Sequence, residues 1–217
     1  MCACKAGIMK DILNAPSIYH LFQVSGGFFS ARVKAINQYL ELRPSQRLID
    51  IGCGPGHILP KLPRGVSYVG FDVDEKYIRF ANNHFGHLGK FHCRVFDAAA
   101  AQEFGPVDGV LMNGVLHHLD DKSFAETVSA IRSALRPGGF LFTLDCVYVP
   151  GQNAISKWLA DNDRGKFVRE VRGYSEILVR FFDKAEFHLR NDLVSVPLSH
   201  DLVKIPLDVF ISKCTRS

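Results

Sequence analysis

Two acidic residues and three glycines form the part of the sequence best suited to binding a ligand. Residues 48–56 read Leu-Ile-Asp-Ile-Gly-Cys-Gly-Pro-Gly, so an apolar run leads directly into three alternating glycines. Glycine lets the backbone turn tightly and lets a ligand approach the main chain without an intervening Cβ atom. Asp72 ends the next apolar run, where a carboxylate can accept hydrogen bonds from both hydroxyls of a ribose. The pattern predicts a nucleoside-binding loop.

Asp50, at the mouth of this loop, distinguishes two classes of cofactor. The glycine spacing is G-x-G-x-G rather than the G-x-G-x-x-G of dinucleotide sites. A carboxylate at this position would repel a pyrophosphate, which needs bare N–H groups and a positive field. It suits the ammonium and sulfonium groups of S-adenosylmethionine (SAM). We therefore expect SAM as cofactor, with S-adenosylhomocysteine as product, rather than NAD.

The adjacent histidines His117 and His118 follow the fourth apolar run and are the candidate catalytic residues. Methyl transfer to a hydroxyl requires an acceptor placed behind the methyl group and a base that removes the proton. A neutral imidazole is the natural base near pH 7, and Asp145 after the fifth run can orient it. One of the two histidines also fits a simple packing role against a helix, so which one faces the substrate stays open.

Apolar runs and amphipathic stretches alternate regularly through the middle of the chain, which predicts βαβ units and a parallel sheet. A helix over residues 28–42 comes first. The expected strands are 47–51, 67–72, 91–97, 107–113 and 140–146, and the expected helices between them are 58–62, 75–85 and 123–135.

The pattern changes after Pro150, where helices are expected at 153–160 and 174–182 and strands at 188–196 and 207–214. Two strands joined this closely pair antiparallel, because a parallel return needs a longer crossover. We expect a single domain over 1–217. Its parts are an N-terminal helical cap (1–44), a SAM-binding core (45–149), a helical insertion (150–185) and a closing β-hairpin (186–217).

Taken together, these motifs resemble those of the class I SAM-dependent methyltransferases of the small-molecule type. The likeness covers roughly residues 45–147 and includes a D-x-G-x-G-x-G loop, the Phe71-Asp72-Val73-Asp74 and Phe96-Asp97-Ala98 motifs, and the stretches 107–119 and 135–144. It implies a Rossmann-like α/β fold with helices on both faces of a seven-stranded sheet. The implied strand order is 3-2-1-4-5-7-6 with the last strand antiparallel, which agrees with the hairpin expected from the C-terminal region.

The resemblance also implies a set of cofactor-binding residues along the edge of the sheet. They are Asp50, Gly52, Cys53, Gly54, Gly56, Asp72, Val73, Asp97, Ala98, Asn113 and Gly114. Some natural-product and sugar O-methyltransferases look similar at the His-His pair and at the acid after the fifth strand.

Candidate substrate-binding residues lie outside the core. They are Tyr19, Gln152, Arg164, Arg169 and Tyr174. Arginine binds carboxylate or phosphate through two parallel hydrogen bonds, so the arginine-rich insertion suits an anionic acceptor. A solvated helix with internal ion pairs is the alternative interpretation of the same charges.

Composition and charge narrow the class of protein. The 217 residues are 47% hydrophobic and 22% charged, with a net charge of +4, which is typical of a globular chain and weak evidence for nucleic acid. The six cysteines have no paired metal-ligand spacing, so no metal is expected. No run is long enough for a membrane span, and no signal-peptide core begins the chain, so we expect a cytoplasmic protein.

These observations predict a SAM-dependent methyltransferase (EC 2.1.1.-) that methylates a small molecule at oxygen with a histidine base. Two alternatives stay open: an RNA or protein methyltransferase, and a SAM-binding accessory subunit without transfer activity. The motif Asn113-Gly114-Val115-Leu116 differs from the N/D-P-P-Y/F of amino-methylating DNA enzymes, and no cysteine nucleophile lies between Cys93 and Cys146. The identity of the acceptor and the oligomeric state stay open.

Overall fold

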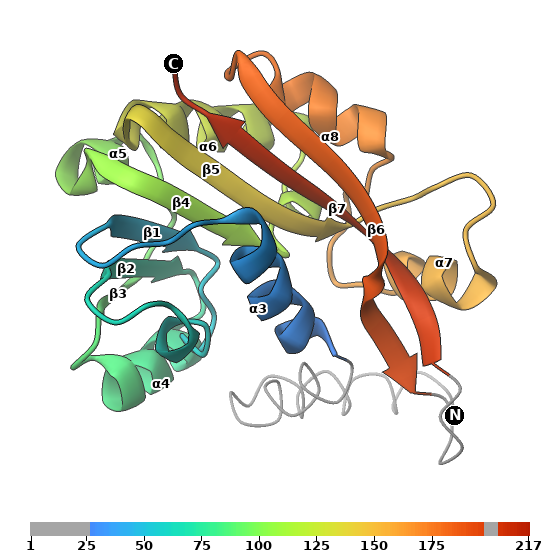
Figure 1. Ribbon diagram of the computed structural model, residues 1–217, viewed down its shortest axis with the longest axis horizontal. Coiled ribbons are helices and arrows are strands. Elements are labelled where there is room, and N and C mark those ends of the chain that lie inside the picture. The colour runs from blue at the N-terminus through green and yellow to red at the C-terminus, as the bar shows by residue number, and fades with distance from the viewer. Residues whose placement is uncertain (1–26, 198–203) are drawn as a thin grey trace.

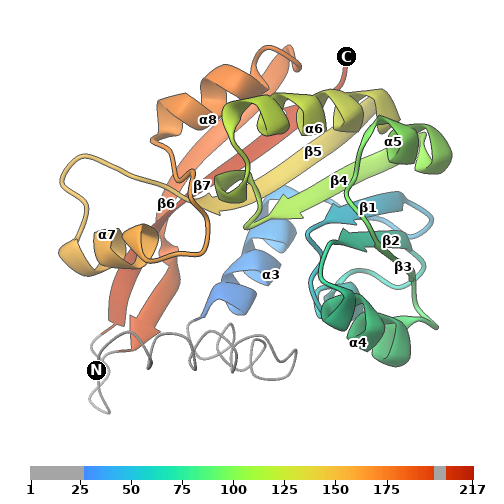
Figure 2. The same cartoon turned by 180° about the vertical axis from the view of Figure 1, so that it is seen from behind.

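A computed structural model describes residues 27–197 and 204–217, in which helices cover both faces of a seven-stranded sheet (Figures 1 and 2). The strands are β1 (Arg47–Ile51), β2 (Ser67–Asp72), β3 (Lys90–Cys93), β4 (Val107–Asn113), β5 (Leu135–Cys146), β6 (Lys184–Pro197) and β7 (Lys204–Thr215). The α-helices are α3 (Phe28–Tyr39), α4 (Glu75–Phe85), α5 (Ala98–Phe104), α6 (Asp121–Ala134), α7 (Ala154–Asp161) and α8 (Val171–Leu178). Two short 3₁₀ turns, η1 (Leu59–Lys61) and η2 (Leu116–His118), complete the list. Tyr19 lies outside the described residues.

The strand order is β3-β2-β1-β4-β5-β7-β6. Strands β1 to β5 pair in parallel, whereas β7 pairs antiparallel with both β5 and β6. The predicted α/β fold and its strand order are therefore confirmed.

Most residues of the central strands are apolar because helices cover these strands on both sides. All seven residues of β4 are buried. Alternate side chains serve two separate clusters: Ile49 and Met112 pack toward α5, α6 and α8, while Leu48 and Leu111 pack toward α3 and α4. This arrangement fixes the sheet between two helical layers, so the ends of its strands are held in place.

Three aspartates begin the helices that follow β2, β3 and η2. Asp74 accepts hydrogen bonds from the amide of Lys76, Asp97 from that of Ala100 and Asp120 from that of Ser123, at 2.8, 2.8 and 2.7 Å. Such N-caps satisfy amide groups that have no partner within the helix. They determine where each helix begins after the carboxyl edge of the sheet.

Several elements differ from the sequence-based expectation. Residues 58–62 contain the 3₁₀ turn η1 rather than an α-helix, α5 was not expected, and α8 lies at Val171–Leu178 rather than at 174–182. β3 ends at Cys93 rather than at Asp97, because the chain leaves the sheet and Asp97 begins the short helix α5. β5 begins at Leu135, and its register against β4 shifts between Leu135 and Phe140. Residues 136–139, which include Gly138 with a φ of 76°, are therefore an irregularity within a longer strand.

The segment between β5 and β6 contains α7, which contacts β7, and α8, which contacts α6 and β6. Tyr174, Ile177 and Leu178 of α8 are buried in the same cluster as α5 and α6. Among the helices that the structure describes, none is both long enough and apolar enough to cross a membrane.

Candidate active site

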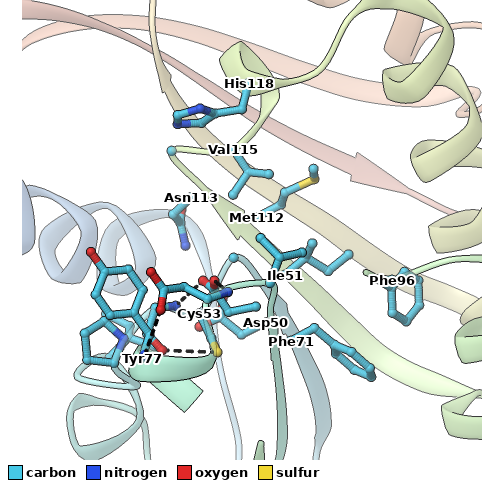
Figure 3. A pocket seen from close by; sticks show the side chains of 18 of the residues that line it. Asp50, Ile51, Cys53, Phe71, Tyr77, Phe96, Met112, Asn113, Val115 and His118 are labelled. Atoms are coloured by element: carbon cyan, nitrogen blue, oxygen red, sulfur yellow. Dashed lines mark hydrogen bonds between the residues drawn. The ribbon is translucent and has the colours of Figure 1, made fainter. Parts of the chain in front are cut away.

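A cavity of about 470 Å³ opens at the carboxyl ends of the strands (Figure 3). Most of its wall comes from four segments, residues 50–55, 71–74, 94–96 and 112–115, which follow β1, β2, β3 and β4. The chain order of the strands reverses between β1 and β4. Open parallel sheets bind ligands at such a switch point.

The glycine loop after β1 forms the floor of this cavity. Gly52, Gly54 and Gly56 have φ values of 71°, 54° and 77°, a region that side chains other than glycine rarely adopt. A Cβ added to Gly54 would have no protein atom within 4 Å, so its α-carbon faces open space. A Cβ on Gly56 would lie 2.8 Å from the Phe91 ring. Gly54 therefore allows approach from the cavity, whereas Gly56, which does not line the cavity, allows the loop to pack on β3.

Asp72 is held in place by the backbone of both neighbouring segments. Its Oδ2 accepts a hydrogen bond from the amide of Gly54, and its Oδ1 accepts one from the amide of Asp74, both at 2.9 Å. Partial burial raises the pKa of this carboxyl group, and these amide hydrogen bonds oppose the shift. Each oxygen keeps further acceptor capacity for a diol. The exposed Val73, 70% accessible, lies beside it on the wall.

Asp50 and Asn113 place buried oxygen atoms at the same cavity. Asp50 is 3% exposed and accepts a hydrogen bond from the hydroxyl of Tyr68 at 2.6 Å. Burial raises its pKa to about 7, although the Tyr68 hydrogen bond and the charge of Arg32 act in the opposite direction. Within the part of the chain that the structure describes, no group donates to the buried Oδ1 of Asn113. Both residues can therefore accept hydrogen bonds from a cationic ligand group.

These features fit SAM. An ammonium group supplies donors for the Asn113 oxygen and a countercharge for Asp50, and a ribose supplies the diol that Asp72 can accept. Gly114, whose φ is 73°, and Cys53 also line the cavity. Of the eleven predicted cofactor residues, Gly56, Asp97 and Ala98 do not line it.

The segment after β3 contributes different residues from those predicted. Arg94, Val95 and Phe96 line the cavity, whereas Asp97 accepts a hydrogen bond from Ala100 as the N-cap of α5. The side chain of Val95 is 61% exposed, which is high for an aliphatic residue. Its place on the wall of the cavity accounts for this exposure. Of the predicted Phe96-Asp97-Ala98 motif, only Phe96 lines the cavity.

His117 is buried and bound at both ring nitrogens. Its Nδ1 lies 2.8 Å from Oδ1 of Asp145 on β5, and its Nε2 lies 3.1 Å from Oδ1 of Asp163. Burial alone would lower the pKa of His117, but the hydrogen bonds to Asp145 and Asp163 outweigh it and raise the pKa well above its usual range. The predicted pairing partner Asp145 thus lies against His117, which does not line the cavity.

His118 has the opposite environment. It lines the cavity and is exposed, and Figure 3 shows it at the far side of Asn113 and Val115 from Asp50. Partial burial of the ring and the nearby charge of His117 lower the pKa of His118, which favours the neutral form of its imidazole. Of the two histidines, His118 is the one that a ligand in the cavity can reach.

The predicted substrate residues fall into two groups. Arg164 lines the cavity. Arg169 instead donates to the backbone oxygens of Leu116 and Leu119, Tyr174 donates to that of Cys146, and Gln152 donates to that of Val147. These three side chains belong to the packing of the insertion and do not line the cavity.

One group in the described ranges has the composition of a metal site. His117, His118 and Asp163 offer ligand atoms that all lie within 4.8 Å of one another. The Nε2 atom of His117 is already within hydrogen-bond distance of Asp163, so a proton accounts for this contact as well as an ion would.

Sequence reasoning missed the contribution of α3 to the site. Phe29 and Arg32 line the cavity, and a guanidinium nitrogen of Arg32 lies 3.0 Å from the position of an added Cβ on Gly114. The sequence around these two residues of α3 contains no motif that indicates a ligand site. Only the packing of α3 beside β4 and β5 brings them to the cavity.

Comparison with known proteins finds a domain model and relatives that match the region forming this site. Residues 49–141 match a family model described as a methyltransferase domain. Over 157 residues the chain is 32% identical to 27-O-demethylrifamycin SV methyltransferase of Amycolatopsis mediterranei, covering 70% of this chain and 54% of that protein. Over 135 residues it is 30% identical to ubiquinone biosynthesis O-methyltransferase of Sinorhizobium medicae, covering 61% and 54%. The chain thus spans about half the length of these relatives.

Solved structures show the same fold. A SAM-dependent methyltransferase from Methanosarcina mazei matches with a TM-score of 0.59 at 18% identity, over 84% of this chain and 97% of that chain. The strand order, the glycine loop with its aspartate partner and the matched domain model agree with one another. We conclude that residues 49–141 form a methyltransferase domain and that the described fold is that of the class I SAM-dependent methyltransferases.

Proposed function

We propose that this chain transfers the methyl group of SAM to a hydroxyl oxygen of a small-molecule acceptor, with His118 as the base. The observation that carries the proposal is the contrast between two adjacent histidines. Both ring nitrogens of His117 contact carboxylates, whereas His118 lines the cavity and has a lowered pKa. A neutral imidazole beside a ligand-sized cavity has the properties of a general base.

The names of the two relatives support oxygen as the methylated atom. One is a 27-O-demethylrifamycin SV methyltransferase and the other a ubiquinone biosynthesis O-methyltransferase. Both names describe methylation of a small molecule at oxygen.

SAM supplies a methyl group activated by the positive charge on sulfur. In the proposed reaction, a bond forms between the acceptor oxygen and the methyl carbon while the bond from that carbon to sulfur breaks. His118 takes the hydroxyl proton, and S-adenosylhomocysteine leaves without the sulfonium charge. Asp50, Asp72 and Asn113 hold the cofactor so that the acceptor oxygen can approach in line, which contributes to rate through positioning.

The position of Arg164 supports the proposal that the acceptor is anionic. It lines the cavity together with His118, on a segment separate from the carboxylates Asp50 and Asp72. A guanidinium at this position can hold a carboxylate or phosphate on the acceptor through two hydrogen bonds. We therefore propose phenols or sugars that carry such a group as the first acceptors to test.

Replacing His118 with alanine tests the base. With labelled SAM and a panel of phenol, catechol and sugar acceptors, we expect His118→Ala to lower kcat by about 10²- to 10⁴-fold. The affinity for S-adenosylhomocysteine should change by less than about twofold, because the cofactor contacts lie on other residues. For the wild type, kcat should rise with pH through a value below about 6.5 and then level off, since the lowered pKa leaves His118 neutral above it.

His87→Ala is the matched control, because His87 is exposed in the turn after α4 and does not line the cavity. It should behave as the wild type. A His118→Ala enzyme that keeps kcat within a few-fold would rule out the histidine base. The acceptor atom would then be an amine, a thiolate or an ionised oxygen, which needs no base.

A further inference from the structure

The segment between α7 and α8 is fastened to η2, the turn that carries both histidines. The amide of Phe167 donates to the backbone oxygen of His117 at 2.9 Å. Arg169, whose side chain is 11% exposed, donates to the backbone oxygens of Leu116 and Leu119 at 3.3 and 2.8 Å. The two segments therefore contact one another on both sides of the histidine pair.

Gly165 allows the segment to lie directly on the His117 ring. A Cβ added at this glycine would lie 2.1 Å from Cδ2 of His117 and 2.6 Å from its backbone oxygen. No larger residue fits in that space without displacing the backbone. The close approach is thus built into the sequence Asp163-Arg164-Gly165.

Asp163 adds a charged contact to this arrangement. Its Oδ1 accepts a hydrogen bond from the amide of Gly165 at 2.7 Å and lies 3.1 Å from Nε2 of His117. The other ring nitrogen of His117 lies 2.8 Å from Asp145. A neutral imidazole has only one N–H group, so two carboxylate partners require the imidazolium form. Hydrogen bonds between charged groups are stronger than those between neutral ones.

We propose that Asp163 is a positioning residue, which holds residues 163–169 against η2 through the His117 imidazolium. Asp145 anchors the other side of the ring on β5, so the contact runs from the sheet through His117 to the segment. Arg164 follows Asp163 directly and lines the cavity, as does His118 beside His117. The effect on catalysis rests on the proposed function, whereas the fastening of the segment does not.

A divalent cation held by His117, His118 and Asp163 is the competing interpretation of the same cluster. A proton is favoured, because the 3.1 Å between Nε2 and Oδ1 is an ordinary hydrogen-bond distance and satisfies both groups without an added ion. The next residue in the chain, Arg164, also brings a positive charge to the cavity wall, which disfavours a cation there.

Trypsin reports directly on the segment, because Arg164, Lys166 and Arg169 are its cleavage sites. With S-adenosylhomocysteine bound, we expect Asp163→Ala to speed cleavage at these sites at least tenfold and Asp163→Asn to have a smaller effect, since asparagine keeps a neutral acceptor. Asp161→Ala is the matched control: Asp161 contacts Lys157 and Tyr148 rather than His117. It should be cleaved at the wild-type rate. Equal cleavage of Asp163→Ala and the control would overturn the proposal.

Kinetics then test the positioning role. For an anionic acceptor that the wild type methylates, Asp163→Ala should raise the acceptor KM at least fivefold, keep S-adenosylhomocysteine affinity within twofold, and be partly rescued by Asp163→Asn. An unchanged KM would overturn the positioning role. If the wild type methylates no acceptor, the proposed function fails, while the trypsin result still decides whether Asp163 fastens the segment.

The wild-type protein offers a measurement that needs no variant to fold. Nitrogen-15 NMR of labelled histidine should show both ring nitrogens of His117 protonated at pH 8, with no change when Zn²⁺, Mn²⁺ or Mg²⁺ is added. A singly protonated His117 would overturn the proposal. So would stoichiometric binding of one of these ions that Asp163→Asn abolishes, because the cluster would then be a metal site.

Discussion

At the scale of single residues, Asp50 combines two opposing requirements. Its buried carboxylate can pair with a cationic ligand, yet the same burial raises its pKa from 3.8 to about 7. Between these two values the folded protein holds a proton that the unfolded chain has released. The free energy of unfolding of the ligand-free protein should therefore fall as pH rises through this window.

Asp50→Asn separates the two requirements. The amide oxygen can still accept the Tyr68 hydroxyl, but the charge is gone. At pH 8 we expect SAM affinity about 10- to 150-fold weaker, which corresponds to the loss of a charge-assisted hydrogen bond. Urea unfolding of the ligand-free variant should show it more stable than the wild type at pH 8. This advantage should shrink by up to about 1.4 kcal/mol for each pH unit toward pH 5.

Tyr68→Phe is the control, because it removes the hydrogen bond and leaves the carboxylate. It should not abolish the pH dependence. A wild type whose stability is constant between pH 5 and pH 8 would contradict the proposed cost of burying Asp50, and an Asn variant with unchanged SAM affinity would show that the ligand's cationic group lies elsewhere.

The sequence could identify those site residues whose role depends on their near neighbours in the chain. Gly54 and Asp72 stand beside strands whose apolar runs are easy to recognise, so their meeting at the sheet edge was predictable. Asp163 was not singled out as a functional residue, because its contact with His117 spans a separation that no local pattern reports. Arg169 and Tyr174 have the residue types of a ligand site, and only the tertiary structure shows that their polar atoms contact the backbone.

At the scale of elements, the loop after β1 determines which space a ligand can use. Its amides at Gly52 and Cys53 both donate to the backbone oxygen of Phe71, at 2.8 and 3.0 Å, and that of Gly54 donates to Asp72. The loop is therefore tied to the end of β2 and does not depend on a ligand for its shape. This predicts a preformed site.

Gly54→Val tests whether a ligand contacts the loop. The added side chain has no protein neighbour within 4 Å, so it would occupy cavity space, and its positive φ adds backbone strain. We expect S-adenosylhomocysteine binding, measured by calorimetry, to weaken more than about 100-fold, a loss of about 2.7 kcal/mol or more.

Gly138→Val controls for the strain. Gly138 also has a positive φ, 76°, and open space around an added Cβ, but it lies within β5 away from the cavity. The two variants should lose similar stability, and only Gly54→Val should lose binding. Normal binding by a folded Gly54→Val protein would mean that the loop is a turn without a ligand role.

Strands were more predictable than the short helices. The runs for β1, β2 and β4 matched the structure residue for residue, because each is a short, largely buried run between turns or loops. Helix α5 was missed because its seven residues, mostly alanine, span too few turns to show a periodic pattern. The cavity residues of α3 were missed for a different reason: their role depends on where the whole helix packs.

At the scale of the whole molecule, β7 pairs with β5 on one side and with β6, its partner in the C-terminal hairpin, on the other. Phe210 at its centre is fully buried, and its ring stacks on Tyr174 of α8 and Phe187 of β6 at centroid distances of 5.2 and 5.7 Å. It therefore connects the insertion to the sheet, outside the cavity.

Phe210→Ala should lower the free energy of unfolding by about 3–5 kcal/mol, through lost burial and the cavity left between the two rings. Urea denaturation measures this change. Leu189→Ala is the control, since Leu189 lies opposite Phe210 in the β6–β7 register but is 51% exposed. It should cost less than about 1 kcal/mol. Equal losses would show that the hairpin contributes little to the core.

The place of β7 in the sheet has a consequence for protein synthesis. β7 lies between β5 and β6 although it follows both in the chain, so a ribosome releases every cavity-lining strand before the strand that covers β5. Until then the edge of β5 presents unpaired N–H and C=O groups beside apolar side chains, an arrangement that promotes aggregation. Thr143 of β5 and Ser212 of β7 are 69 positions apart, and they can form their hydrogen bond only after β7 has been synthesised. A chaperone that binds the nascent chain would have to shield the edge of β5 until β7 pairs with it.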